Sequence, residues 1–141
     1  MALIDNLTRL ENRGQINAHI INIVFQVKNR LETYWHADTS TYQVEMLLLH
    51  LASSLARIQR GYCASPLYKV MFEEIKSAVI FPQVFNIHLD LLRFMPFDIP
   101  DAEQSYFIAN IYSLLQEQGN RIINPPFLSK IQQNSDKLTK N

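Results

Sequence analysis

Apolar residues recur at intervals of three and four along most of this sequence, and this spacing limits the fold more than any other feature. Between positions 15 and 35 they stand at Ile16, Ile20, Ile23, Val24, Val27, Leu31 and Tyr34. An α-helix places residues with this spacing on one face, whereas a strand alternates every second residue. The many β-branched residues here make a strand the competing interpretation, but the segment is too long for one strand. The sequence therefore predicts a helix over 15–35.

A second helix is predicted over 42–60, where characteristic residues mark both ends. Its N-cap is one of three neighbouring hydroxyl residues, Thr39, Ser40 and Thr41. Each has a side-chain oxygen that can accept a hydrogen bond from a free N–H group of the first turn. Gly61 stands where the residue after a helix commonly takes a left-handed conformation. Arg57 and Arg60 lie in the last turns, where positive charge complements the helix dipole.

Prolines divide the following residues into three further helices. Pro66, with Ser65 as its cap, opens the first of them, and Pro82 opens the next, which ends at Pro96. The last helix is predicted over 98–119. Proline is favoured in a first turn because the N–H that it lacks would have no partner there. Since short connections favour antiparallel neighbours, the predicted fold is all-α, a single five-helix bundle with antiparallel helix pairs.

The 141 residues suffice for one domain with a short segment on either side. The helical domain is predicted over 14–119. The N-terminal segment, 1–13, can form a short helix whose apolar face would hold Leu3, Leu7 and Leu10. Residues 120–141 are polar and lose the periodicity, which indicates a C-terminal tail.

Charge and composition exclude several classes of protein. Thirteen Lys and Arg balance 13 Asp and Glu, so direct nucleic-acid binding is not expected, because phosphate neutralisation needs a cationic excess. The single cysteine, Cys63, excludes an internal disulfide and a multi-cysteine zinc site. No apolar run approaches the roughly 20 residues that cross a bilayer, and the N-terminus lacks a signal-peptide pattern. We expect a cytoplasmic protein without membrane contact, whose near-zero charge favours self-association.

Motifs for catalysis are missing from the sequence. It contains no nucleophile elbow, no phosphate-binding glycine loop and no zinc-binding HExxH pattern. We therefore expect no enzymatic activity, no cofactor and no metal site. Histidines are the remaining candidates, because imidazole can act as ligand, base or phosphoryl acceptor near neutral pH. His19, His36 and His88 are interpreted as structural, and Cys63 as a bystander thiol.

His50 lies in the middle of the predicted helix 42–60, within a run of leucines. Ser53 and Ser54 stand one turn further on, and Arg57 stands two turns further on along the same face. A histidine among leucines is commonly a core residue, and this is one interpretation of His50. The other is that His50 carries a phosphoryl group, which the Arg57 guanidinium would stabilise.

These residues resemble the PTS regulation domain, or PRD, family. The first matching segment holds a histidine, a helical tail ending in arginine and a Pro-Leu pair: His50, Leu51, Ala52–Arg57 and Pro66–Leu67. The second has an Ile-Pro start, an acidic residue and an aromatic-aliphatic helix: Ile99–Pro100, Glu103, Phe107 and Ile108. The two segments keep the order and separation found in the family. The resemblance covers residues 10–118.

Two positions depart from the family pattern. Family members often have an acidic residue directly before the first histidine, where this chain has Leu49. A second phosphorylated histidine is expected where this chain has Asn110. Asparagine cannot accept a phosphoryl group. The resemblance therefore implies that His50 is the phosphoacceptor, Arg57 the residue that supports the phosphate, and Asn110 a degenerate second site.

The resemblance implies a homodimer that receives phosphoryl groups from HPr or an EIIB protein of the sugar phosphotransferase system. The residues outside 14–119 are too few for an output module, so the chain resembles a stand-alone PRD or one domain of a larger protein. It would control transcription-related output or a regulatory partner protein. Two other interpretations stay open. One is a PRD-like module that has lost phosphorylation and works by dimerisation or partner binding, and the other is a small all-α ligand binder.

Overall fold

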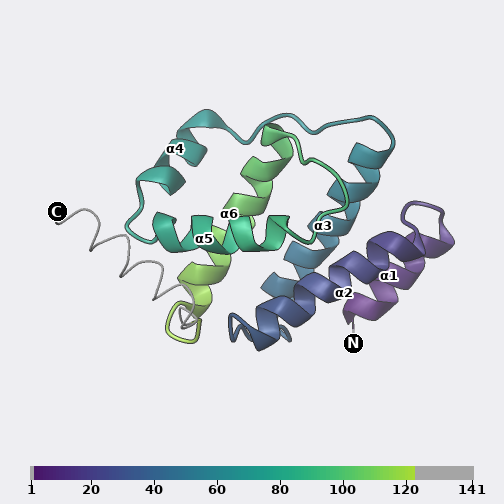
Figure 1. Cartoon of the computed structure of the whole chain (residues 1–141), viewed down its shortest axis with the longest axis horizontal. Helices are drawn as coiled ribbons and strands as arrows, with labels where there is room; N and C mark the ends of the chain where they lie inside the picture. The colour runs from purple at the N-terminus through teal and green to yellow at the C-terminus, as the bar shows by residue number, and fades with distance from the viewer. Residues whose placement is uncertain (1, 123–141) are drawn as a thin grey trace.

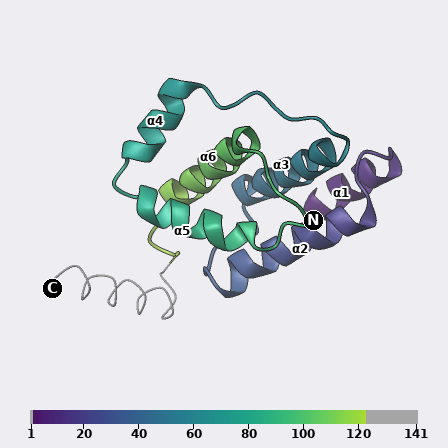
Figure 2. The same cartoon turned by 45° about the horizontal axis from the view of Figure 1, so that its top comes forward.

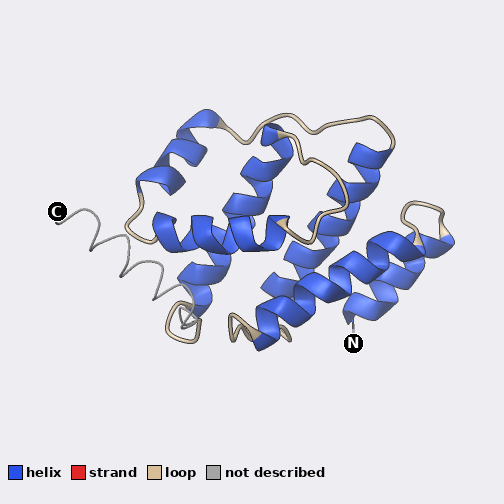
Figure 3. Ribbon diagram, in the orientation of Figure 1, coloured by secondary structure: helices blue, strands red, loops and turns tan. Residues whose placement is uncertain are grey.

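The computed structural model of the chain describes residues 2–122 and folds them into six helices without a strand (Figures 1 and 3). Their bounds are α1 Ala2–Asn12, α2 Ala18–Thr33, α3 Tyr42–Gln59, α4 Lys69–Ser77, α5 Phe81–Leu92 and α6 Asp101–Gln118. The all-α prediction is confirmed. Five of the helices, α2–α6, lie within the predicted domain 14–119. The sixth, α1, is the short helix that the sequence allowed for residues 1–13, so the described residues hold one helix more than the predicted five.

This first helix belongs to the folded core. Leu3 and Leu7 lie one turn apart on α1 and are both buried. The Asn6 side-chain nitrogen also donates a hydrogen bond to Glu45 Oε1 on α3, at 3.0 Å. Burial of two leucine side chains contributes a few kcal/mol, roughly 1.5–3 kcal/mol for each. The helix is therefore held by tertiary contacts rather than by its own short length.

The two central helices of the fold are α3 and α6. α3 contacts α1, α2 and α6, and α6 also contacts α4 and α5. Figure 2 shows α1 and α2 on one side of this central pair, and α4 and α5 on the other. The core between them contains Trp35, Leu48, Leu55, Ile87 and Leu114, all of them fully buried. Contacts between α3 and α6 thus join the two halves of the chain.

Side chains cap the N-termini of two helices, and one of these caps was predicted. Thr41 accepts a hydrogen bond from Val44 N at 3.3 Å, so it is the N-cap of α3 among the three candidates. Asn17 accepts one from Ile20 N at 2.9 Å, so α2 starts at Ala18, three residues later than predicted. Gly61 has a φ of +86°, the left-handed conformation expected after a helix.

The prediction that Ser65 and Pro66 open a helix is wrong. Residues 60–68, here called the connector, run as a non-helical segment from α3 to α4, which begins only at Lys69 (Figure 1). Side chains of α6 satisfy two connector amides: Ala64 N donates to Glu103, and Leu67 N donates to Ser105 Oγ at 3.0 Å. Because these amides are bound by α6, they do not enter a helix.

The predicted tail, 120–141, lies mostly outside the described residues. Of its first three positions, Ile122 is buried against the core, so the packed part of the chain extends slightly past 119. Among the helices in 2–122, none is both long enough and apolar enough to span a membrane.

Candidate functional site

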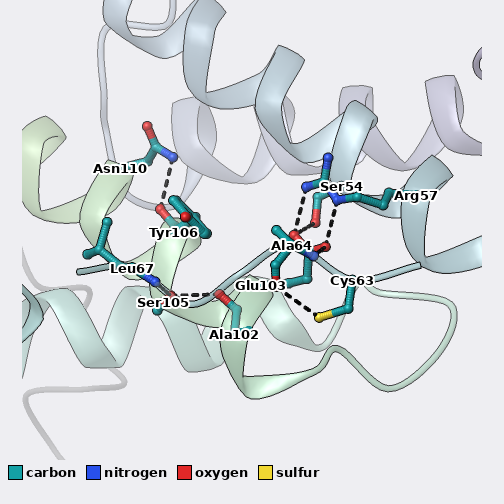
Figure 4. A network of polar contacts seen from close by, with 10 residues as sticks. All are labelled: Ser54, Arg57, Cys63, Ala64, Leu67, Ala102, Glu103, Ser105, Tyr106 and Asn110. Carbon is teal, nitrogen blue, oxygen red and sulfur yellow. Dashed lines mark hydrogen bonds and ion pairs between the residues drawn. The ribbon is translucent and has the colours of Figure 1, made fainter. Parts of the chain in front are cut away.

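A buried carboxylate lies at the junction of α3, α6 and the connector. The Glu103 residue is 1% exposed. Arg57 donates to it twice, from Nε to Oε2 and from Nη2 to Oε1, each at 2.8 Å. Ser54 Oγ donates to Oε1 at 2.8 Å, and Ala64 N donates to Oε2 at 2.9 Å (Figure 4). These four hydrogen bonds satisfy a charge that would otherwise be very costly to bury.

The sequence spacing explains how these groups meet. Ser54 and Arg57 stand three residues apart, so both side chains project from one face of α3. Glu103 is the third residue of α6, where the positive end of the helix dipole favours a carboxylate. Gly61 follows Arg60, the C-cap of α3, and its left-handed conformation turns the chain out of the helix. The connector then passes Glu103 with its Ala64 amide facing the carboxylate.

Hydrogen bonding and charge shift the pKa values of this pair in opposite directions. The hydrogen bonds from Arg57 lower the pKa of Glu103, against the effect of burial, and those from Ala64 and Ser54 lower it further. The hydrogen bond to Glu103 raises the pKa of Arg57. Both groups therefore stay charged over the whole physiological pH range.

His50 is exposed on the wall of a pocket that also contains this ion pair. The pocket has a volume of about 260 Å³ and is lined by His50, Ser53, Ser54, Arg57, Ala64, Glu103, Tyr106 and Phe107. The interpretation of His50 as a core residue is wrong, because the leucines of α3 face the core while His50 faces outward. His50 can be reached by another molecule and shares its pocket with Arg57.

The other two predicted site residues are placed differently. Arg57 lies in the same pocket as His50, but two of its nitrogens are bound to Glu103. Sequence reasoning missed this pairing. Asn110 donates from Nδ2 to Tyr106 O at 2.9 Å (Figure 4). It lines a separate apolar cavity with Phe107, whose ring borders both spaces.

Two curated bacterial proteins are similar to this chain over most of its length. An "Uncharacterized protein" of Haemophilus influenzae is 57% identical over 118 residues, which cover 84% of this chain and 94% of that protein. The Escherichia coli "Uncharacterized protein YhfY" is 32% identical over 108 residues, covering 77% and 90%.

The chain belongs to the family of these two proteins. No family model matches it. No solved structure matches it either. The printed names of these relatives assign no ligand, reaction or partner.

His88, interpreted as structural, is fully buried on α5. Its Nε2 lies 2.9 Å from Gln104 Oε1, and Gln104 Nε2 donates to Ile99 O at 2.8 Å. Since the amide nitrogen of Gln104 is used by Ile99, its oxygen faces the ring and His88 Nε2 acts as the donor. Burial lowers the pKa of His88, and the hydrogen bond with Gln104 opposes that effect in part. The ring is therefore neutral at pH 7.

A second arginine–carboxylate cluster joins α2 to α5. Asp90 accepts two hydrogen bonds from Arg30, at 2.8 and 2.9 Å, one from Trp35 Nε1 at 2.8 Å and one from Arg93 at 2.6 Å. Burial acts to raise the pKa of Asp90, but these donors together lower it. His88 and Asp90 have different hydrogen-bond partners, although they are two residues apart on α5. This cluster ties α2 to α5 and lies away from His50.

A metal site finds no support in the described residues. Between positions 2 and 122, His, Cys, Asp and Glu side chains form no group of three that could hold an ion. Cys63 is exposed, and its thiol donates to the neighbouring Ala64 carbonyl at 3.4 Å. The ionisable side chains that line the His50 pocket are those of His50, Arg57, Glu103 and Tyr106.

Proposed function

We propose that this chain is a regulatory module of the PRD type, a helical bundle with antiparallel pairs that works in the cytoplasm. His50 accepts a phosphoryl group from HPr or an EIIB protein of the sugar phosphotransferase system. The observation that carries the proposal is the exposure of His50 on a pocket that contains Arg57. A buried histidine could not meet a protein donor, whereas this one can. Arg57 offers a positive charge to the group transferred.

The transfer needs no further catalyst from this chain. A ring nitrogen of His50 donates its lone pair to phosphorus while the bond between phosphorus and the donor protein breaks. The electron pair of that bond stays with the donor, and the other ring nitrogen of His50 keeps its proton. The product carries an added charge of about −1.5 to −2, by comparison with other phosphorylated side chains.

This charge changes the balance around Arg57. A guanidinium has five N–H donors, and Glu103 uses two of them. The phosphoryl group therefore competes with Glu103 for the arginine. If the Arg57–Glu103 pair weakens, the buried carboxylate loses its counterion. An unpaired buried charge destabilises the fold strongly. Glu103 also holds Ala64, so the connector is the segment that responds.

The homodimer expected of such a module forms, in this proposal, through α4 and α5. Their outer faces and flanks expose Tyr68, Val70, Met71, Val79, Phe85 and Leu89, with Val79 96% exposed. Several large apolar side chains exposed on two neighbouring helices are typical of an interaction site. α4 also carries Lys69 and Glu74 along one groove, and an antiparallel pair of α4 helices would place each lysine opposite the glutamate of the other copy.

Sedimentation analysis of a Val70→Glu, Met71→Glu variant tests this face. We expect the wild type to be dimeric at micromolar concentration and this variant to be monomeric. Tyr42→Glu, at an exposed position on α3 outside the α4–α5 face, is the matched control and stays dimeric. A monomeric wild type contradicts the dimer without bearing on His50.

Intact-mass analysis after incubation with phosphoenolpyruvate, enzyme I, HPr and a panel of EIIB proteins tests the phosphorylation. We expect one acid-labile phosphoryl group on the wild type and on His19→Gln, and none on His50→Gln. His19 is the matched control because it is also an exposed helical histidine. Absence of added mass with every donor contradicts the proposal.

The second candidate function is a phosphorylation-incompetent module that binds a partner through the same fold. The engagement of Arg57 by Glu103, together with Leu49 and Asn110, favours it. In that case the mass spectrum stays unchanged, while the dimer or a partner complex persists in His50→Gln.

A further inference from the structure

A second pocket opens on another side of Arg57, between α3 and the turn that joins α1 to α2. Its volume is about 420 Å³. Its polar wall is formed by Ser53 and Arg57 of α3, Arg60 at the start of the connector and Gln15 of the turn. Leu10 and Ile16 belong to its apolar part. Ser53 and Arg57 line this pocket and the His50 pocket alike. We call it the Arg60 groove.

The charge of the Arg60 groove is positive. Two guanidinium groups line it, and no acidic residue is among its lining residues in the described part of the chain. Glu103 neutralises Arg57 from the far side, which leaves the charge of Arg60 uncompensated there. Within residues 2–122 the Arg60 side chain donates one hydrogen bond, from Nη1 to Gln15 O at 3.4 Å, near the limit for a hydrogen bond. Several N–H groups of both arginines therefore remain free to donate within residues 2–122.

The end of α3 does not cancel this charge. A helix C-terminus disfavours an anion because its last carbonyls have no partner. Here the carbonyls of Arg57 and Ile58 accept hydrogen bonds from Tyr62 N and Gly61 N, at 3.0 and 2.9 Å. The helix dipole explains why arginines are favoured at the end of α3. It does not explain why they line the Arg60 groove together with the Ser53 hydroxyl.

We propose that the Arg60 groove binds a phosphate monoester of a small metabolite. The Arg60 guanidinium, the N–H groups of Arg57 that Glu103 does not use and the Ser53 hydroxyl together offer donors for the three terminal oxygens of a phosphate. A carboxylate is satisfied by one arginine. The volume lies in the range of small-molecule sites, roughly 300–1,000 Å³. The apolar residues of the lining would contact the carbon skeleton. This site does not depend on phosphorylation of His50.

Thermal unfolding and calorimetry with glucose 6-phosphate as probe test this site. At 100 times Kd we expect Tm to rise by about 5 °C or more in the wild type. The same rise is expected in His50→Gln, so the result does not depend on the proposed phosphoacceptor. Three further ligands serve as controls at matched ionic strength. Glucose lacks the phosphate group, and inorganic phosphate lacks the sugar. Succinate carries two negative charges without a phosphate.

Arg60→Gln should abolish the rise. Arg121→Gln is the matched control, because Arg121 also makes one hydrogen bond to a backbone carbonyl, His36 O, at 3.1 Å, and does not line the groove. Loss of the rise in Arg60→Gln, with its retention in Arg121→Gln, supports the site. No rise in the wild type, an equal rise with succinate or an equal rise in Arg60→Gln would overturn the proposal.

Discussion

Arg57 and Glu103 are 46 residues apart in the sequence and are joined by two hydrogen bonds of 2.8 Å between α3 and α6. The contact lies where the two halves of the chain meet. It also holds the connector through Ala64 and borders both the His50 pocket and the Arg60 groove. The stability of the fold and the properties of the two surface pockets therefore depend on the same ion pair.

Removal of the arginine should destabilise the protein strongly. We expect Arg57→Met to lower the free energy of unfolding by about 2–3 kcal/mol, below the full cost of an unpaired buried charge. The reduction reflects the 35% exposure of the Arg57 side chain, which lets water screen the carboxylate. The double variant Arg57→Met, Glu103→Gln should recover part of the loss. Urea unfolding measures both.

The exposed pair Lys76–Glu73, at 3.0 Å, supplies the control. Lys76→Met should change the free energy of unfolding by less than about 0.5 kcal/mol, because surface ion pairs contribute little. Equal effects of Arg57→Met and Lys76→Met would show that the Glu103 carboxylate does not depend on its partner.

Much of this fold could be predicted from periodicity and end signals, because these act over a few residues. Thr41, Gly61 and Pro82 mark helix ends as expected. The connector could not be predicted from Ser65 and Pro66. Its conformation depends on Glu103 and Ser105, which lie about 40 residues away in sequence, and local signals do not carry such contacts.

The candidate site, like the fold, could be predicted from the sequence only where local spacing decides it. Spacing placed His50 and Arg57 on one face of a helix, and both do line one pocket. The run of leucines around His50 suggested burial, yet a helix buries one face and exposes the other. The sequence did not identify Glu103 as the partner of Arg57. A glutamate in the first turn of a helix is already explained by its favourable interaction with the helix dipole. Pairing across the core is set by packing, which a single sequence does not record.

Acid should weaken the fold through Glu103 and Asp90. Both carboxyls have folded-state pKa values below their usual 4.5 and 3.8. Their contribution is therefore fully present above these values and is lost as the pH falls through the lower, folded values. We expect the free energy of unfolding to decline below about pH 4.5. Glu103→Gln should be less stable at pH 7 but decline less steeply, as urea titrations at successive pH values would show.

His88 should add a separate loss of stability nearer neutrality. Burial holds its folded pKa below the usual 6.5, so the unfolded chain binds a proton first as the pH falls. The free energy of unfolding should then decrease from pH 6.5 downward. His88→Gln retains a donor without this titration and should flatten the slope between pH 6.5 and 5. His19→Gln, at an exposed position, should leave it unchanged, and an unchanged slope in His88→Gln would contradict this account.

Gly61 should tolerate a side chain only at a cost in backbone strain. Its φ of +86° disfavours residues with a Cβ, although an added Cβ would meet no atom within 4 Å. We expect Gly61→Ala to lower the free energy of unfolding by about 1 kcal/mol. Gly61→Asn should lose less, because asparagine accepts left-handed conformations more readily. Chemical denaturation of the two variants compares them, and equal losses would point to a cause other than backbone conformation.

A negative charge at position 50 should loosen the connector. His50→Glu places a carboxylate in the pocket that contains Arg57, where it competes with Glu103 for the guanidinium. Since Glu103 also binds Ala64 N, we expect faster amide hydrogen exchange in residues 60–68 of this variant. His50→Gln, which adds no charge, should exchange at the wild-type rate. Phosphorylated wild type should resemble His50→Glu. An unchanged connector in both would mean that the charge at His50 does not act through Arg57 and Glu103.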